Sequence, residues 1–174
     1  MKNRKNEVVV IVPIKLNNKR LPGKNIMSLG GKPLLEYILH KLINSTKISK
    51  VIVCCSDFTI VDYLPDHIEF LQRPKELDRD DTNFTEIFSF ISKSIEAEVY
   101  VYAHATAPFL KTTSIDKCID AVTRENFDSS FSATEFRDFL WDSSFKPINF
   151  DPTALPRSQD LPLYYRETSG VYVF

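Results

Sequence analysis

The sequence has little cysteine, and none of it is spaced for a disulfide framework or a metal site. Only Cys54, Cys55 and Cys118 occur in 174 residues. Their number is odd, and their spacing is not that of zinc ligands. Cys54 and Cys55 fall in an apolar segment typical of a strand, where neighbouring side chains point to opposite faces. We therefore expect three reduced thiols, mostly in the core.

Long apolar runs are also missing. No segment approaches the roughly 18 consecutive apolar residues that a membrane helix needs. The first residues, MKNRKNE, are basic and precede an apolar run, as in a signal peptide. However, this run is short, is interrupted by Pro13 and Lys15, and lacks a small-residue cleavage site. We expect a cytoplasmic protein without a membrane partner.

The chain also lacks an excess of either positive or negative charge. Lys+Arg 22 and Asp+Glu 23 give a net charge of -1, so the chain lacks the basic field that non-specific nucleic-acid binding uses. No nucleic-acid partner is expected, and any attraction for phosphate must be local. The length and the 43% hydrophobic content predict a single domain over residues 1–174.

Strand-like and helix-like segments alternate as far as residue 134. The expected strands are 8–14, 51–55, 69–71, 98–104 and 129–134. The expected helices are 33–43, a short one near Ile60, 85–96 and 112–124. This alternation predicts an α/β fold with a mostly parallel sheet, right-handed crossovers and helices on both faces.

The alternation fails after Glu135. The segment 142–162 contains four prolines, which disfavour regular helix and central strand. It also carries too many aromatic residues for a disordered segment. We expect an arm over residues 139–164 that packs on something else, with another subunit as one candidate. The chain then stops on an apolar strand, Gly170 to Phe174, so we expect that part of the parent protein is missing.

A basic loop, KLNNKRLPGKN, follows the first expected strand directly. It spans Lys15 to Asn25 and contains four cations and a Pro22-Gly23 turn. Open α/β sheets bind nucleotides at such a strand end, and cations there can converge on phosphate oxygens. The loop matches neither the Walker nor the dinucleotide fingerprint, so a solvated basic loop is the alternative.

This loop, followed by GGKPLLEY, resembles the signature of the acylneuraminate (CMP-sialic acid) cytidylyltransferase family. Further matches come in the family's order: CSD at 55–57, RPKEL at 73–77, DT at 81–82, ATAPFL at 105–110, and PRSQDLP at 156–162 leading to YRETSGVY at 165–172. Six motifs in order are far more specific than any one of them.

The resemblance implies a glycosyltransferase-A-like (Rossmann-like) nucleotidyltransferase fold with a protruding dimerisation arm. It implies transfer of CMP from CTP to a nine-carbon 2-keto sugar acid, with release of pyrophosphate, in a homodimer. It also implies Mg²⁺, which family members hold through an Asp-x-Asp motif beyond residue 174. The acidic run 78–81 is better explained as a solvated loop. The chain by itself is therefore expected to bind nucleotide weakly and to turn over poorly.

Site residues follow from the resemblance position by position. The CTP ligands would be Lys15, Asn18, Lys19, Lys24, Asn25, Arg73, Asp81, Thr82 and Thr85, with Lys15 and Lys24 catalytic. The sugar-acid ligands would be His104, Thr106, Arg166, Ser169 and Gly170.

Each candidate also has an ordinary structural explanation. Arg73 would be a surface cation, and Thr82 or Thr85 a helix N-cap. Arg166 would pair with Glu167 or Glu135, and His104 would be a core histidine.

Departures from the family pattern bear on the acceptor. Lys15 replaces an arginine, Asn18 a serine, and His104 a sugar-contacting glutamine. N-acetylneuraminic, legionaminic and pseudaminic acids therefore stay open as acceptors. A Kdo cytidylyltransferase shares Arg-Leu-Pro-Gly-Lys but has Gly-Asp-Glu-Pro where this chain has Ala105-Thr106-Ala107-Pro108. A non-catalytic nucleotide or sugar-acid binding module is the rival outside the enzymes.

Overall fold

The computed structural model describes residues 7–174, which divide into two compact units. The first unit comprises the described residues as far as Ser132 together with Ser169–Phe174, and the second comprises Ala133–Thr168. The basic stretch that imitates a leader, and the start of the expected single domain, fall on residues 1–6, outside the described part.

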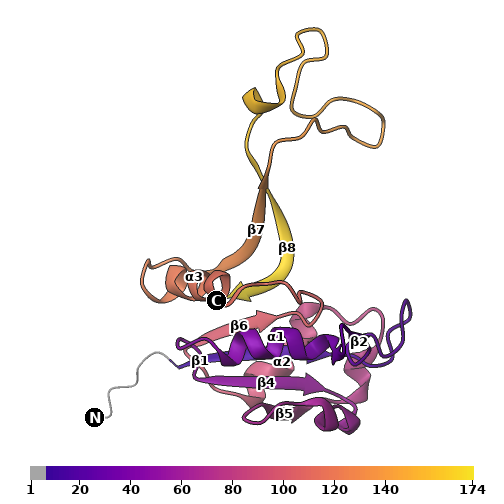
Figure 1. Cartoon of the computed structure of the whole chain (residues 1–174), viewed down its shortest axis with the longest axis vertical. Helices are drawn as coiled ribbons and strands as arrows, with labels where there is room; N and C mark the ends of the chain where they lie inside the picture. Colours follow the sequence, from indigo (N-terminus) through magenta and orange to yellow (C-terminus); the bar gives the residue numbers. More distant parts are fainter. Residues whose placement is uncertain (1–6) are drawn as a thin grey trace. The chain divides into compact units, whose positions relative to one another are not determined.

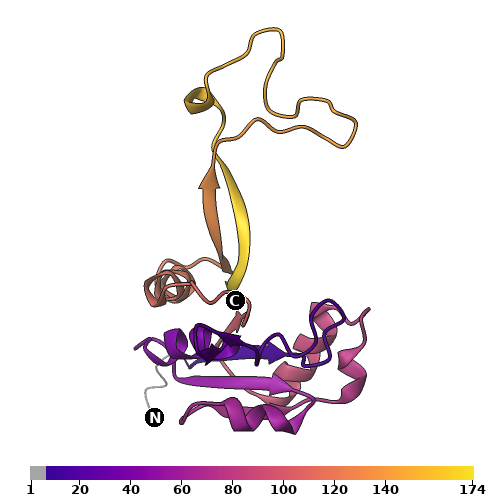
Figure 2. The ribbon, with the colours of Figure 1, turned by 45° about the vertical axis from the view of Figure 1, so that its right-hand side comes forward.

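The main sheet is mixed and has six strands in the order β5-β4-β1-β6-β8-β7 (Figures 1 and 2). Its parallel strands are β1 (Val8–Ile14), β4 (Lys50–Cys55), β5 (Glu69–Gln72) and β6 (Val99–Ala103). The last strand, β8 (Tyr164–Val173), pairs antiparallel with β6 through Val171–Val173, and β7 (Ser130–Phe136) is its other neighbour. The mostly parallel sheet predicted from the alternation is confirmed.

Side chains of β1 alternate between two apolar clusters on opposite faces. Val10 and Val12 join the cluster that includes Ile38 of α1 (Leu34–Ile43) and the buried residues of α3 (Thr112–Thr123). Val9 and Ile11 join the cluster that includes Ile91 of α2 (Phe84–Ser94). Because a strand directs successive side chains to opposite faces, this division confirms that helices cover both faces.

The cysteines follow the same alternation. Cys54 packs in the α2 cluster and Cys55 in the α1 cluster, and all three cysteines are free thiols. Burial raises the pKa of Cys54 to about 11, so this thiol stays protonated at neutral pH. The expectation of reduced thiols, mostly in the core, is confirmed.

Helix α2 begins one residue earlier than expected, and its cap is neither threonine. The Asn83 side chain accepts a hydrogen bond from the Glu86 N–H, while the Glu86 carboxylate accepts one from the Asn83 N–H. This capping box satisfies two backbone donors at once. The N-cap alternative for Thr82 and Thr85 is therefore wrong.

Short elements connect the main ones. A hairpin of β2 (Ser28–Leu29) and β3 (Lys32–Pro33) turns at Gly30-Gly31, both with positive φ. The 3₁₀ turns are η1 (Phe58–Tyr63), η2 (Lys75–Asp78) and η3 (Ser158–Asp160), and Asp57 caps η1 through the Thr59 N–H. Among residues 7–174, no helix combines the length and apolar character needed to cross a membrane.

The second unit contains the range 139–164 where an arm is expected. Phe150 packs edge-on against Phe139 and Trp141, with ring centroids 4.8 and 5.1 Å apart. The Asn149 side chain ties the loop together, since it accepts from Leu140 N and donates to the Asp138 carbonyl. Several apolar side chains here remain exposed, with Phe145 at 86%. Packing of this unit on another subunit stays a prediction.

Candidate nucleotide site

The basic loop after β1 is held by hydrogen bonds of its own backbone. The Gly23 N–H donates to the Leu16 carbonyl at 2.7 Å, and Gly23 adopts φ +67°, as a glycine turn allows. Asn25 is buried, and its side-chain amide donates to the Lys15 carbonyl at 3.1 Å. The loop therefore has one defined shape at the end of the strand.

A polar cavity of about 220 Å³ lies at the carboxyl ends of β1, β5 and β6. Its wall contains Lys15, Asn18, Lys24, Asn25, Arg73 and Thr82 of the expected CTP ligands, and His104 and Thr106 of the expected sugar-acid ligands. Lys19, Asp81 and Thr85 are not in this wall, and neither are Ser169 and Gly170. The loop and three later motifs, far apart in the sequence, thus converge on one cavity.

Arg73 is buried rather than a surface cation. Its Nη2 and Nε lie 2.6 and 3.1 Å from Oδ1 of Asp78, and the side chains are 2% and 12% exposed. The Ser56 hydroxyl donates to the other oxygen of the same carboxylate. A buried guanidinium needs such a partner, because an unpaired buried charge is strongly destabilising.

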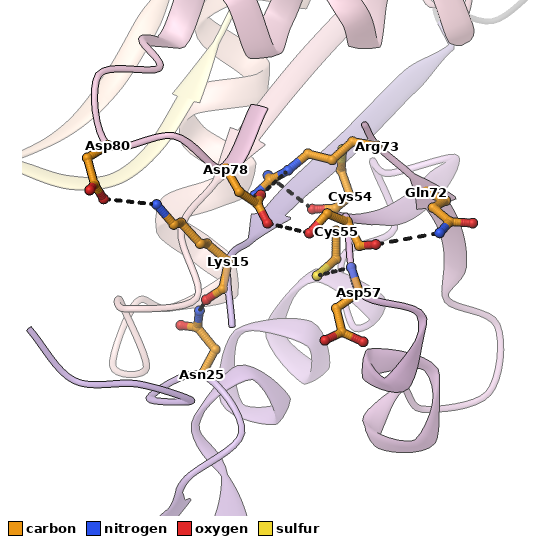
Figure 3. A network of polar contacts seen from close by, with 10 residues as sticks. Lys15, Asn25, Cys54, Cys55, Asp57, Gln72, Arg73, Asp78 and Asp80 are labelled. Carbon is orange, nitrogen blue, oxygen red and sulfur yellow. Dashed lines mark hydrogen bonds and ion pairs between the residues drawn. The ribbon is translucent and has the colours of Figure 1, made fainter. Parts of the chain in front are cut away.

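Asp80 sits between two expected phosphate ligands. Its carboxylate pairs with Lys15 Nζ at 3.2 Å and with Lys19 Nζ, and Figure 3 shows Lys15 extended toward it. These lysines hold the pKa of Asp80 below its ordinary value. The interpretation of run 78–81 as a solvated loop is wrong for Asp78, whose side chain is 12% exposed and paired with buried Arg73. It agrees with Asp80 and Asp81, whose side chains are 48% and 81% exposed.

Two oxygens in the cavity wall are buried without a hydrogen bond from residues 7–174. They are Oδ1 of Asn18 and Oγ1 of Thr82. Buried polar atoms are nearly always hydrogen-bonded, so an orphaned pair at a cavity is a feature of binding sites. Both residues are among the expected CTP ligands.

Sequence reasoning missed two polar residues of the wall, Arg79 and Tyr102. Arg79 lies within the acidic run 78–81, which was interpreted as a solvated loop. A single cation among three carboxylates could have indicated a role for it. Tyr102 lies on β6, and alternation alone could not indicate that its side chain reaches a cavity. Burial raises its pKa to about 12, so its phenol remains a hydrogen-bond donor.

Two other expected sugar-acid ligands, Gly170 and Arg166, do not line the nucleotide cavity. The Gly170 carbonyl accepts from the His104 N–H at 3.0 Å, and a Cβ at Gly170 would lie 3.0 Å from Ser132 Oγ. A side chain at residue 170 would thus press on the Ser132 hydroxyl. Arg166 belongs to the second unit, where its guanidinium lies over the Phe136 ring and 3.7 Å from Asp138, a partner that the sequence did not indicate.

The described part of the chain has no ready-made cluster of metal ligands. In the range 7–174, no group of three or more His, Cys, Asp or Glu side chains could hold a metal ion. The carboxylates of Asp78, Asp80 and Asp81 are instead paired with Arg73, Lys15, Lys19 and Arg79.

Residues 9–173 match the sequence profile of a family described as Cytidylyltransferase. The chain belongs to this cytidylyltransferase family. It is 27% identical over 152 residues to N-acylneuraminate cytidylyltransferase A of Danio rerio, covering 82% of this chain and 35% of that protein. It is also 27% identical over 176 residues to pseudaminic acid cytidylyltransferase of Campylobacter jejuni, covering 93% and 75%.

Other members are similar at comparable identity. A 3-deoxy-manno-octulosonate cytidylyltransferase of Geobacter sulfurreducens is 24% identical over 112 residues, covering 64% of this chain and 44% of that protein. The chain spans only 35% and 41% of the lengths of two fish N-acylneuraminate cytidylyltransferases that it matches.

Solved structures share the fold. A CMP:2-keto-3-deoxy-manno-octonic acid synthetase, solved with CTP, superposes with a TM-score of 0.71 at 15% identity, covering 97% of this chain and 73% of that one. A 4-diphosphocytidyl-2C-methyl-D-erythritol synthase from Anaerococcus prevotii gives a TM-score of 0.64 at 14% identity, covering 96% and 69%. At this identity the likeness shows the fold.

Proposed function

We propose that the protein transfers CMP from CTP to a sialic-acid-like 2-keto sugar acid and releases pyrophosphate. The observation that carries this proposal is the convergence of Lys15, Lys24 and Arg73 with two unpartnered oxygens on one cavity at the strand ends. Membership of the cytidylyltransferase family supports the choice of CTP.

In the proposed reaction, the anomeric hydroxyl oxygen of the acid bonds to the α-phosphorus of CTP. The bond from that phosphorus to the bridging β-phosphate oxygen breaks, the hydroxyl proton passes to solvent or a base, and pyrophosphate leaves. Lys15 and Lys24 would bind the triphosphate and offset the charge that develops on the leaving group. Arg73, already neutralised by Asp78, would position the wall rather than carry a free charge.

Magnesium is proposed from the resemblance alone. Because the described carboxylates do not fit it, no step is assigned to the metal here. We likewise propose a homodimer in which the second unit contacts a second copy, and a cytoplasmic location. The exposed apolar side chains of the second unit, such as Phe145 and Leu155, support the contact.

The test has a binding part and a turnover part. Calorimetry with CTP, UTP, GTP and ATP should show a preference for CTP, and Lys24→Ala should weaken CTP by about tenfold or more. Lys50→Ala is the matched control, because Lys50 lies at the start of β4 and pairs with Glu69. Equal binding of all four nucleotides, or equal effects of the two variants, would contradict the proposal.

Turnover is measured as pyrophosphate release with CTP, Mg²⁺ and one acceptor at a time. The acceptors are N-acetylneuraminic, legionaminic and pseudaminic acids and Kdo, because relatives that act on different acids match at similar identity. Release with a nine-carbon acid supports the proposal, and release with Kdo alone supports the Kdo cytidylyltransferase. CTP binding with no release for any acid favours the binding module.

A further inference from the structure

The cations that line the nucleotide cavity differ in how firmly a carboxylate already holds them. They are Lys15, Lys24, Arg73 and Arg79. The Lys15 Nζ lies 3.2 Å from Asp80, and the buried Arg73 guanidinium lies 2.6 Å from Asp78. A triphosphate would have to compete with these two carboxylates. The charge that is left for it comes mainly from Lys24, which is already an expected CTP ligand, and from Arg79, which is not.

The ion pairs of Arg79 are of the exposed kind. Its Nε lies 3.1 Å from Oδ1 of Asp81, and its Nη2 lies 3.2 Å from Oε1 of Glu86. The Arg79 side chain is 53% exposed, and the two carboxylate side chains are 81% and 38% exposed. Neither carboxylate belongs to the cavity wall. Because water screens exposed ion pairs, Arg79 can leave these partners at little cost.

The start of α2 does not depend on these pairs. Glu86 uses one carboxylate oxygen, Oε1, for Arg79 and the other, Oε2, to accept from the Asn83 N–H at 2.9 Å. Loss of the Arg79 pair therefore leaves the capping box in place. The Arg79 backbone is held separately, since its carbonyl accepts from the Thr82 N–H. The Arg79 side chain can thus change partners while the surrounding backbone stays as it is.

We propose that Arg79 is a further ligand of the triphosphate, and that its guanidinium exchanges Asp81 and Glu86 for phosphate oxygens when the nucleotide binds. This inference rests on the proposed function, since it takes the nucleotide cavity to hold CTP. A guanidinium stays charged and presents parallel N–H donors that match two phosphate oxygens. A triphosphate carries several negative charges and each carboxylate carries one, so the exchange favours the nucleotide.

Calorimetric titration of the Arg79→Gln variant with CTP and with CMP tests the contact. Arg79→Gln should weaken CTP by about tenfold or more and CMP by less than about threefold, because CMP lacks the β- and γ-phosphates. Arg124→Gln is the matched control, since Arg124 is also exposed and paired with a carboxylate, Asp120, but lies outside the cavity wall. An unchanged affinity for CTP, or equal losses for CTP and CMP, would overturn the inference.

The exchange of partners is tested by Glu86→Gln. Glutamine can still complete the capping box, but it carries no charge to hold Arg79. CTP should therefore bind about two- to fivefold more tightly to Glu86→Gln at low salt. In the Arg79→Gln background the same change should have no effect, because the cation that it frees is gone. An equal gain in both backgrounds would contradict the exchange.

Failure of the inference can be distinguished from failure of the proposed function. A parent chain that binds no CTP contradicts the proposed function, and the inference with it. A parent chain that binds CTP no more tightly than Arg79→Gln does contradicts the inference alone. Arg79→Lys should recover part of the lost affinity, because it keeps the charge without the parallel donors. Circular dichroism of each variant shows whether a loss of binding is a loss of folding.

Discussion

The Nζ of Lys15 lies 3.2 Å from the Oδ1 of Asp80, so a carboxylate already holds a cation that a bound phosphate would need. Asp80 pairs with Lys19 as well, and these lysines lower its pKa. The group is therefore ionised at neutral pH. A triphosphate entering the cavity must compete with this carboxylate for Lys15.

Asp80→Asn should consequently strengthen nucleotide binding. Removing the negative charge frees the lysines, and we expect the Kd of CTP to fall by about three- to tenfold at low salt, with a smaller change at high salt. Calorimetry at two ionic strengths measures this. Asp66→Asn, at an exposed carboxylate outside the cavity wall, is the control. Weaker binding by Asp80→Asn would mean that Asp80 positions the lysines instead.

Asp78→Asn should destabilise the fold much more than loss of a surface pair. It leaves the Arg73 guanidinium, 2% exposed, without a counter-charge, which should cost about 3 kcal/mol of the free energy of unfolding. Urea denaturation measures the change. Glu69→Gln, which breaks the exposed pair with Lys50, should cost less than about 1 kcal/mol. Similar losses would show that the Arg73 charge is solvated.

Gly23→Ala should strain the loop without a clash. A Cβ there would find Ile26 Cγ1 at 3.8 Å, an ordinary contact, so the cost comes from φ +67° alone. We expect a loss of about 1 kcal/mol in unfolding free energy, and a smaller loss for Gly23→Asn, because asparagine tolerates this conformation better. Thermal and urea denaturation compare the two. Equal losses of unfolding free energy for Gly23→Ala and Gly23→Asn would indicate a steric clash instead of backbone strain.

Alkaline pH should destabilise the protein through Cys54. Its pKa is about 11 in the fold against 9.0 for the ordinary thiol, because burial disfavours the thiolate. The unfolded chain thus ionises first, and stability falls as pH rises from 9.0 toward 11. At pH 10 this should amount to about 1 kcal/mol.

Cys54→Val removes this titration while keeping an apolar side chain of similar size. Urea denaturation at pH 8 and pH 10 should show a smaller loss of stability for Cys54→Val than for the parent chain, by about 1 kcal/mol. An identical pH dependence would contradict the assignment to Cys54.

Much of the fold could be predicted because it is encoded locally. The run from Val8 to Ile14 is apolar throughout, as a strand buried on both faces requires, and the spacing of Leu35, Ile38, Leu39 and Leu42 gives one buried helix face. The antiparallel direction of β8 could not be predicted in this way. Strand direction depends on where a long connection returns, not on the residues of the strand.

Part of the nucleotide site could be predicted because its residues follow strands that the sequence indicates. Lys15, Asn25 and Arg73 follow strands that the sequence indicates, so their placement at one sheet edge could be expected. The partners of these residues could not be predicted. Run 78–81 contains three aspartates, and the sequence does not indicate which of them pairs with which cation. Only the turn of η2 brings Asp78 to Arg73, and only the loop after it brings Asp80 to Lys15.

The sequence by itself determined the order of the elements and the motifs of the cytidylyltransferase family, because hydrophobic period and motif spacing are properties of the chain. The tertiary structure decided which charges are paired and which are available in the nucleotide cavity. Pairing and enclosure depend on distances between side chains from different strands and loops, and these distances exist only once the sheet has formed.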